Sequence, residues 1–155
     1  MKIRTATTKD IKEILNLLSQ VLQIHHNDRP DIFRPNATKY DENELKEIIN
    51  DDKRPIFVYE DATRVLGYAF CIIKETKDNN ILYDHKTLYI DDLCVDKNNR
   101  SKGIGVALYN HVLSYARAIS CQSITLNVWE CNEGAKRFYK KMGLLPQKTI
   151  MEKLL

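Results

Sequence analysis

Two closely spaced glycines, Gly103 and Gly105, constrain the fold of this chain more than any other feature. They lie between a β-rich run that ends at Val95 and an amphipathic pattern that follows the glycines, so the chain passes there from a strand into a helix. Glycine lets a backbone approach a ligand without an intervening Cβ. Free N–H groups at the start of a helix, with the helix dipole behind them, bind phosphate groups. Because Arg100 and Lys102 add positive charge, the turn predicts a phosphate or pyrophosphate site.

The residues of this segment do not match two other nucleotide-binding motifs. A dinucleotide-binding fingerprint requires a third glycine where Leu108 stands. A P-loop requires Gly-Lys followed by Ser or Thr, and the chain contains no such triplet. An ordinary strand-to-helix turn remains the alternative to a phosphate cradle.

The first third of the chain predicts a short strand and two helices. Residues 2–6 alternate in polarity as a strand does, and apolar residues recur at helical spacing over 11–22. Asp41 and Glu44 resemble the cap of a second helix. Because prolines disrupt helix interiors, residues 25–36, which contain two of them, are predicted to be irregular.

The remainder predicts strands first and then alternating helices and strands. An antiparallel hairpin is expected over 56–73 with a polar connection at 61–64, and residues 81–95 contain at least one long strand. Further elements are expected as a helix over 104–119, a strand over 123–128, a helix over 133–142 ended by Gly143, and one or two strands in the tail up to Leu155. The order β-α-α-β-β-β-α-β-α-β, with a parallel crossover between the fourth and fifth strands, predicts an α/β domain spanning residues 1–155.

The composition narrows the class of partner. A net charge of +3 is too small to indicate nucleic-acid binding, and no apolar run approaches the roughly 20 residues that cross a bilayer. We expect no signal peptide. The four cysteines have no metal-binding spacing and are typical of buried residues in a reducing cytoplasm, so a cytoplasmic protein without a metal is expected.

A second motif follows about thirty residues after the glycines. Asn132 is a suitable N-cap, and a helix after it would place Ala135, Phe138 and Met142 on one face, with Tyr139 on nearly the same side. R-x-x-G-x-G from Arg100, followed by N-x-x-A-x-x-F-Y-x-x-x-G from Asn132, resembles the GNAT superfamily of N-acetyltransferases, and the resemblance covers nearly the whole chain.

The resemblance implies a mostly antiparallel sheet with helices on both faces and a slot for acetyl-coenzyme A where the fourth and fifth strands diverge. The pantetheine arm would pair with the backbone of Leu93, Cys94 and Val95. Asn132, Ala135 and Tyr139 would lie near the cofactor, the first and last of them beside its sulfur. The pyrophosphate would be held by the N–H groups of Arg100, Ser101, Lys102, Gly103, Ile104, Gly105 and Val106.

The reaction implied is transfer of the acetyl group to a primary amine of a small molecule or of a protein lysine or N-terminus. Such an amine must lose a proton before it attacks. Asp91 is favoured as the base or amine ligand, with Asp92 as the alternative. Neighbours in a regular strand point to opposite faces, so only one faces the acetyl group unless a bulge intervenes. The alternative for both aspartates is that they are solvated charges at the end of a strand, without a catalytic role.

Tyr139 would act as the acid that protonates the departing thiolate, although a packing role alone is the plain interpretation of this tyrosine. A backbone N–H near Leu93 or Cys94 would stabilise the negative charge on the carbonyl oxygen. Nothing in the sequence lowers the pKa of Cys94, so a covalent role is not favoured. His25 and His26 belong to the segment that shapes the acceptor pocket in the superfamily, and either is a second candidate base.

Two further questions stay open in the sequence. An acyl-coenzyme A-binding regulatory domain without catalysis is the alternative to an enzyme, although such a domain needs neither an acid nor a base. The apolar end of the chain would suit a homodimer.

Overall fold

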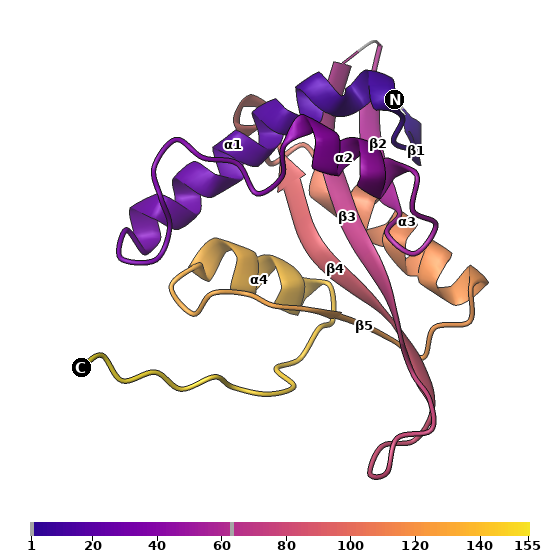
Figure 1. The fold of residues 1–155 in the computed structure, drawn as a ribbon. Helices are drawn as coiled ribbons and strands as arrows, with labels where there is room; N and C mark the ends of the chain where they lie inside the picture. The colour runs from indigo at the N-terminus through magenta and orange to yellow at the C-terminus, as the bar shows by residue number, and fades with distance from the viewer. Residues whose placement is uncertain (1, 63) are drawn as a thin grey trace.

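The computed structural model describes residues 2–62 and 64–155, which form a five-stranded sheet with helices on both faces (Figure 1). The elements are β1 (Lys2–Thr5), η1 (Thr8–Asp10), α1 (Ile11–Asp28), α2 (Glu42–Ile49), β2 (Ile56–Asp61), β3 (Arg64–Thr76), β4 (His85–Val95), η2 (Lys97–Asn99), α3 (Ile104–Ala118), β5 (Ser123–Leu126) and α4 (Glu133–Lys141).

The strands lie in the sheet in chain order, from β1 to β5. Every neighbouring pair is antiparallel except β4 and β5, which are parallel. The predicted mixed, mostly antiparallel sheet and its crossover are therefore confirmed. Thr63, part of the predicted 61–64 connection, lies outside the described residues.

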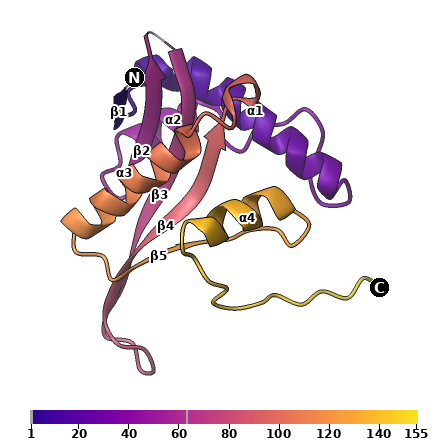
Figure 2. The same cartoon turned by 180° about the vertical axis from the view of Figure 1, so that it is seen from behind.

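The two faces of the sheet carry separate helix layers (Figures 1 and 2). α1 and α2 cover one face, and α3 lies across the other. The core under α1 and α2 includes Ile14, Leu18, Leu45 and Tyr68. The core under α3 includes Leu88, Ile90 and Val112, and side chains from α4 pack against it. Apolar side chains at helical spacing thus bury against strand residues that alternate between the faces.

The first helix is longer than the sequence predicts. α1 continues through Asp28, so His25 and His26 are helical and not in an irregular segment. The helix ends at Asp28, and its C-cap residue Arg29 has non-helical backbone angles (φ −137°, ψ 70°). A proline disfavours helical geometry in the residue before it, so Pro30 ends the helix from outside without disturbing the last turn.

The predicted strands at the end of the chain are absent, which corrects that part of the expected order. α4 ends in a turn in which Gly143 has a φ of 89° and Leu144 N–H donates to the Tyr139 carbonyl at 3.1 Å. Residues 144–155 then form neither helix nor strand and extend away from the sheet (Figure 1). A strand requires a neighbouring strand for its hydrogen bonds, and the tail reaches none within the described residues.

Gly67 marks the tightest packing between β3 and its surroundings. A Cβ at this position would lie 2.8 Å from the Cys94 carbonyl oxygen and 3.1 Å from Leu108 Cδ1. Real Cβ atoms do not approach a backbone oxygen that closely. Because β3 pairs with β4 at Gly67 and Val95, the glycine sets how closely α3 approaches the sheet.

Gly67→Ala should therefore lower the free energy of unfolding by about 1–3 kcal/mol, the usual cost of overpacking a core. Gly134→Ala is the matched control, because a Cβ there lies 3.8 Å from the nearest atom, Asn132 Oδ1. That change should leave stability unchanged or raise it by up to about 1 kcal/mol, since alanine favours a helix. Denaturant unfolding of both variants decides the point, and equal stabilities would contradict it.

Candidate active site

The parallel strands β4 and β5 stay paired for only part of their length. Thr87 to Ile90 pair with Ser123 to Leu126, and the pairing ends there. β4 continues to Val95 on its other side, where it remains paired with β3. The edge of β4 over 91–95 therefore faces away from β3 with no strand beside it in the described part of the chain. The resemblance to the superfamily implies such a divergence. The pairing ends at Leu126, two residues before the predicted end of the fifth strand.

A β-bulge lies at the first residue of this free edge. Phe70 pairs with Asp92 and Cys71 pairs with Ile90, so Asp91 is an extra residue in β4. In a regular strand Ile90 and Cys94 would share a face, because they are four residues apart. Instead Ile90 belongs to the core under α3 and Cys94 to the core under α1 and α2. The alternation is thus shifted by one residue between them.

The bulge brings both carboxylates to the same face of the sheet. Tyr40 Oη donates to Asp91 Oδ2 at 2.7 Å, and Tyr68 Oη donates to Asp92 Oδ2 at 2.7 Å. Both tyrosine rings contact Phe70, with centroid separations of 5.6 Å for Tyr40 and 4.9 Å for Tyr68. In a regular strand Asp91 and Asp92 would point to opposite faces of the sheet. Because of the bulge, they do not.

The two carboxylates differ in their charge partners. Lys39 Nζ lies 2.8 Å from Asp91 Oδ2 and also donates to the Asp91 carbonyl oxygen at 3.2 Å. Asp92 has no ion pair among the described residues. Burial raises the pKa of the Asp92 carboxyl above its usual range, and the hydrogen bond from Tyr68 offsets this only in part. Asp91 is therefore a paired anion, whereas Asp92 holds a proton more readily than an ordinary aspartate.

Tyr139 lies on α4, the helix that follows β5. Burial raises the pKa of its hydroxyl, and the negative charge of Asp92 raises it further. The start of α4 is fixed by Asn132, whose Oδ1 accepts a hydrogen bond from Ala135 N–H at 3.0 Å, as the N-cap prediction requires. The predicted acid and the half-buried Asp92 carboxylate are thus electrostatic neighbours, although they lie about fifty residues apart in the sequence.

The glycine segment forms a turn that opens α3. Gly103 is the N-cap with a φ of 80°, and Ser101 is also left-handed at 64°. The N–H groups of Ile104, Gly105 and Val106 lie in the first turn, where a helix offers them no acceptor. They are the N–H groups that the sequence predicts to bind a phosphate at this turn.

The turn before these N–H groups is held in place by polar contacts. Asp96 Oδ1 accepts from Asn98 N–H at 3.0 Å, and its other oxygen accepts from Gln20 Nε2 at 3.1 Å, so the turn is tied to α1. Arg100 and Lys102 are exposed at its surface. Lys102 Nζ donates to Asn99 Oδ1 at 2.9 Å.

Gly105 lies where the glycine turn meets β4 and α4. A Cβ at Gly105 would lie 3.5 Å from the Phe138 ring and 3.7 Å from Val95. The start of α3, the end of β4 and the middle of α4 therefore meet at this residue. The structure thus brings together the free edge of β4, the glycine turn that opens α3, and the helix that carries Tyr139.

The last turn of α1 and the loop after it place aromatic side chains next to this site. The His25 ring stacks on Phe33 at 5.0 Å, and Phe33 meets Trp129 edge-on at 5.4 Å. His26 Nδ1 lies 2.7 Å from the Phe33 carbonyl oxygen. His26 is thus engaged with the loop backbone, whereas His25 contacts the ring of Phe33.

Sequence reasoning missed the residues that distinguish the two aspartates. Tyr40 and Lys39 come from the loop before α2, and Tyr68 from β3, so none is adjacent to the acidic pair in the chain. Tyr68 and Phe70 do alternate in a run of strand residues, which places them on one face. No signal in the sequence links Lys39 to Asp91.

Cysteine chemistry is not supported by the environment of Cys94. Burial raises the pKa of its thiol to about 12, and its Sγ donates to the Leu17 carbonyl at 3.7 Å. The thiolate needed for a nucleophile is therefore disfavoured. Within residues 2–62 and 64–155, no group of three or more His, Cys, Asp or Glu side chains is arranged to hold a metal ion.

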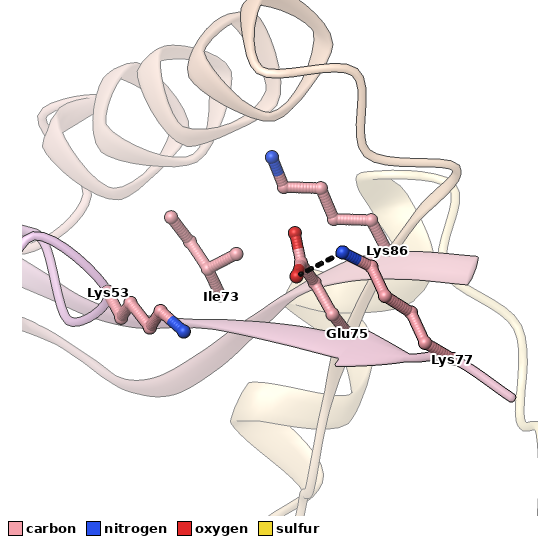
Figure 3. Close-up of a pocket in the computed structure, with 5 residues that line it drawn as sticks. All are labelled: Lys53, Ile73, Glu75, Lys77 and Lys86. Atoms are coloured by element: carbon pink, nitrogen blue, oxygen red, sulfur yellow. Dashed lines mark ion pairs between the residues drawn. The ribbon is translucent and has the colours of Figure 1, made fainter. Parts of the chain in front are cut away.

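A separate pocket lies outside this region. It has a volume of about 520 Å³ and is lined by Lys53, Ile73, Glu75, Lys77 and Lys86, with Glu75 and Lys77 paired at 3.3 Å (Figure 3). None of the predicted site residues lines it. Its lining is charged except for Ile73.

Comparisons with known proteins agree with this geometry. The Acetyltransferase (GNAT) family matches residues 18–144. An uncharacterised N-acetyltransferase of Methanocaldococcus jannaschii is 26% identical over 106 residues, which are 68% of this chain and 46% of that protein. The match thus spans less than half of that relative.

Solved structures resemble the whole chain. A mutant of the BH1408 protein of Bacillus halodurans is 33% identical with a TM-score of 0.96, covering 100% of this chain and 99% of that one. An aminoglycoside N-acetyltransferase in complex with CoA has a TM-score of 0.72 at 13% identity, covering 99% and 98%, and shares the fold. No helix in the described part of the chain is long and apolar enough to span a membrane. From the family match and the glycine turn beside a divergent β4 edge, we conclude that the chain belongs to the acetyltransferase (GNAT) family of acyltransferase enzymes.

Proposed function

We propose that this protein transfers an acetyl group from acetyl-coenzyme A to a primary amine by direct attack, with both substrates bound at once. The observation that carries the proposal is the bulge at Asp91, which sets two carboxylates on one face of β4 at the point where β5 diverges. A domain that only bound a coenzyme would need the slot but not a buried carboxylate with a raised pKa beside a tyrosine. We further propose that residues 1–155 form a single acetyltransferase domain and that the protein is cytoplasmic.

The residues around the slot fit the coenzyme. Coenzyme A would supply the acetyl thioester, and its pantetheine arm has the amide groups that pair with a free strand edge. The free edge of β4 at Leu93, Cys94 and Val95 would bind that arm. N–H groups over Arg100–Val106 would hold the pyrophosphate, and Ala135 and Asn132 would border the thioester. The left-handed Gly103 leaves open space there, since no atom lies within 4 Å of the position of a Cβ.

Asp92 is the better candidate for the base. Its raised pKa lies closer to neutral pH than that of an ordinary carboxylate, which favours proton transfer from an ammonium group. The charge of Asp91 is already paired with Lys39, so Asp91 would orient that lysine and Tyr40 and help to bind the amine. This reverses the preference that the sequence alone gives.

Tyr139 would donate a proton to the sulfur as the thioester breaks. A tyrosine with a raised pKa stays protonated at neutral pH, and it regains its proton from solvent after transfer. A backbone N–H of the β4 edge near Leu93 would stabilise the negative charge that develops on the carbonyl oxygen. Two acidic side chains beside the acetyl group would suit cationic acceptors such as polyamines or lysine side chains.

The coenzyme assignment is tested by thermal unfolding with acetyl-coenzyme A, coenzyme A, ATP and NADH. A ligand at a hundred times its Kd adds about 2.7 kcal/mol, or roughly 5–10 °C for a chain of this size. Both coenzyme A species should raise Tm and NADH should not. Arg100→Ala with Lys102→Ala should reduce the shift, whereas Lys9→Ala with Lys12→Ala, which removes equal charge from η1 and α1, should not. Flat curves with both coenzyme A species would overturn the proposal.

The base is tested by comparing Asp92→Asn with Asp91→Asn in an assay of free thiol released with a panel of amines. Asp92→Asn should lower kcat/KM by about 10²–10⁴-fold. Asp91→Asn should cost less than about tenfold, because it removes a partly exposed ion pair. The reverse order of effects would assign the base to Asp91.

Stability separates a catalytic from a structural role for Asp92. Because burial raises the folded-state pKa of Asp92 above its unfolded value, stability falls as pH rises from the unfolded to the folded pKa. Asp92→Asn removes that cost and still accepts the bond from Tyr68. The variant should therefore be more stable than the wild type at neutral pH, and no more stable at a pH below the unfolded pKa. A loss of stability at neutral pH would point to a structural role.

The acid is tested with Tyr139→Phe, which keeps the ring and removes the hydroxyl. The kcat should fall by about 10²-fold or more, while the thermal shift with acetyl-coenzyme A stays the same. Tyr115→Phe is the control, since Tyr115 packs on Phe57 through its ring at 5.0 Å. Coenzyme binding without thiol release from the wild type over the whole amine panel would favour the regulatory alternative.

A further inference from the structure

Lys39 places a primary amine at the acidic pair of the candidate site. It lies in the connection between α1 and α2, outside any helix or strand. Its Nζ is 2.8 Å from Asp91 Oδ2 and donates to the Asp91 carbonyl oxygen at 3.2 Å, across 52 residues of the chain. Of the lysine ion pairs found within the described residues, this one alone brings an ammonium group to a predicted catalytic residue.

The contacts of this amine are those that the proposed reaction requires of an acceptor. Asp91 binds it as an anion, and it lies over the ring of Tyr40, 5.6 Å from the centroid, where the ring face attracts a cation. The positive charge of Lys39 opposes the rise in the pKa of Asp92, so the proposed base is within electrostatic reach of the amine. The charge of Asp92 in turn raises the pKa of Tyr139. One chain therefore carries an amine, a base and an acid at the same site.

The ion pair leaves the amine free to move. The Lys39 side chain is 42% exposed, and a pair of that exposure contributes little to stability, because water screens it and a long side chain must be ordered. Asp91 begins the part of the β4 edge that has no β5 residue beside it, and the proposed coenzyme-binding residues Leu93, Cys94 and Val95 follow directly. Rotation about the bonds of the lysine side chain can therefore carry Nζ from Asp91 toward the thioester.

We propose that Lys39 is a self-acetylation site, at which Nζ takes the acetyl group when acetyl-coenzyme A is bound and no external amine is present. This rests on the acetyl transfer proposed above. The nitrogen attacks the carbonyl carbon, a C–N bond forms and the C–S bond breaks. The ammonium first gives one proton to solvent through Asp92. The nitrogen releases a second proton after the attack, which balances the proton that Tyr139 gives to the sulfur. The products are an acetyl-lysine amide, the free coenzyme thiol and one proton.

Self-acetylation would change the charge at the acceptor position. An acetylated lysine keeps an N–H donor but loses its positive charge. Asp91 would then be an anion without an ion pair, next to the place where the proposed reaction needs an ammonium group. A cationic external amine would no longer compete with Lys39 for that carboxylate.

The first test is the mass of the full chain before and after incubation with acetyl-coenzyme A without an added amine, with the modified residue located in peptides. The wild type should gain one acetyl group at Lys39, and Lys39→Arg, which keeps the charge, should gain none. Lys46→Arg is the matched control, because Lys46 pairs with Glu42 at the same 2.8 Å and its side chain is 49% exposed, but the pair lies within α2. This variant should still be acetylated at Lys39. An unmodified Lys39 would overturn the proposal.

The rate of modification separates catalysed transfer from spontaneous acetylation of exposed lysines. Lys39 should be acetylated at least about tenfold faster than Lys46, because the site holds its amine beside the thioester. Asp92→Asn and Tyr139→Phe should lower the rate at Lys39 and leave the rate at Lys46 unchanged. At saturating acetyl-coenzyme A, dilution of the protein should not change the rate per chain, since the amine and the site belong to one molecule. Equal rates at the two lysines, or a rate that falls on dilution, would overturn the proposal.

A parallel assay with the amine panel distinguishes a failure of self-acetylation from a failure of the proposed function. Transfer to external amines with Lys39 unmodified would overturn self-acetylation and leave the proposed function intact. Coenzyme binding without transfer to either kind of amine would overturn both. Acetylation of Lys39 without transfer to any external amine would support self-acetylation and overturn the assignment of an external acceptor.

Discussion

The extra residue in β4 at Asp91 is the feature on which the rest of the site depends. Without it, Asp91 and Asp92 would point to opposite faces, and one of them would face the core under α3. With it, both meet tyrosines on the face covered by α1 and α2, at 2.7 Å each. The bulge also falls where the pairing of β4 with β5 ends, because the last pair joins Ile90 and Leu126. A single irregularity thus coincides with both the carboxylate pair and the free strand edge.

The placement has an electrostatic consequence that differs for the two residues. Asp91 is neutralised by Lys39 from the loop before α2, so its charge costs the fold little. Asp92 is half-buried and has no ion pair of its own in the described chain, and desolvation raises its pKa. Such a group is unfavourable for stability at neutral pH and useful as a proton acceptor. The hydrogen bond from Tyr68 holds it in place without neutralising it.

The sequence predicts the order of elements well, because each depends on local spacing or a cap. The N-caps at Asp41 and Asn132 and the left-handed Gly143 lie where they were expected. The bulge could not be predicted, since it is a property of the register between β4 and β3, and no pattern within 90–95 reveals it. The strands predicted for the tail are absent for a related reason: a strand needs a hydrogen-bonded neighbour, and the residues of the tail do not show whether one is within reach.

The position of Tyr139 depends on a helix with few anchors. α4 has no fully buried residue, and it is held by the N-cap at Asn132, by the packing of Phe138 on Gly105 and on the core under α3, and by the turn at Gly143. Its apolar face lies beside the open edge of β5. Phe138, next to Tyr139 in the chain, lies against Gly105 at the start of α3, and Asn132 fixes the first turn of α4. The glycine turn and the N-cap together therefore determine where the hydroxyl of Tyr139 lies.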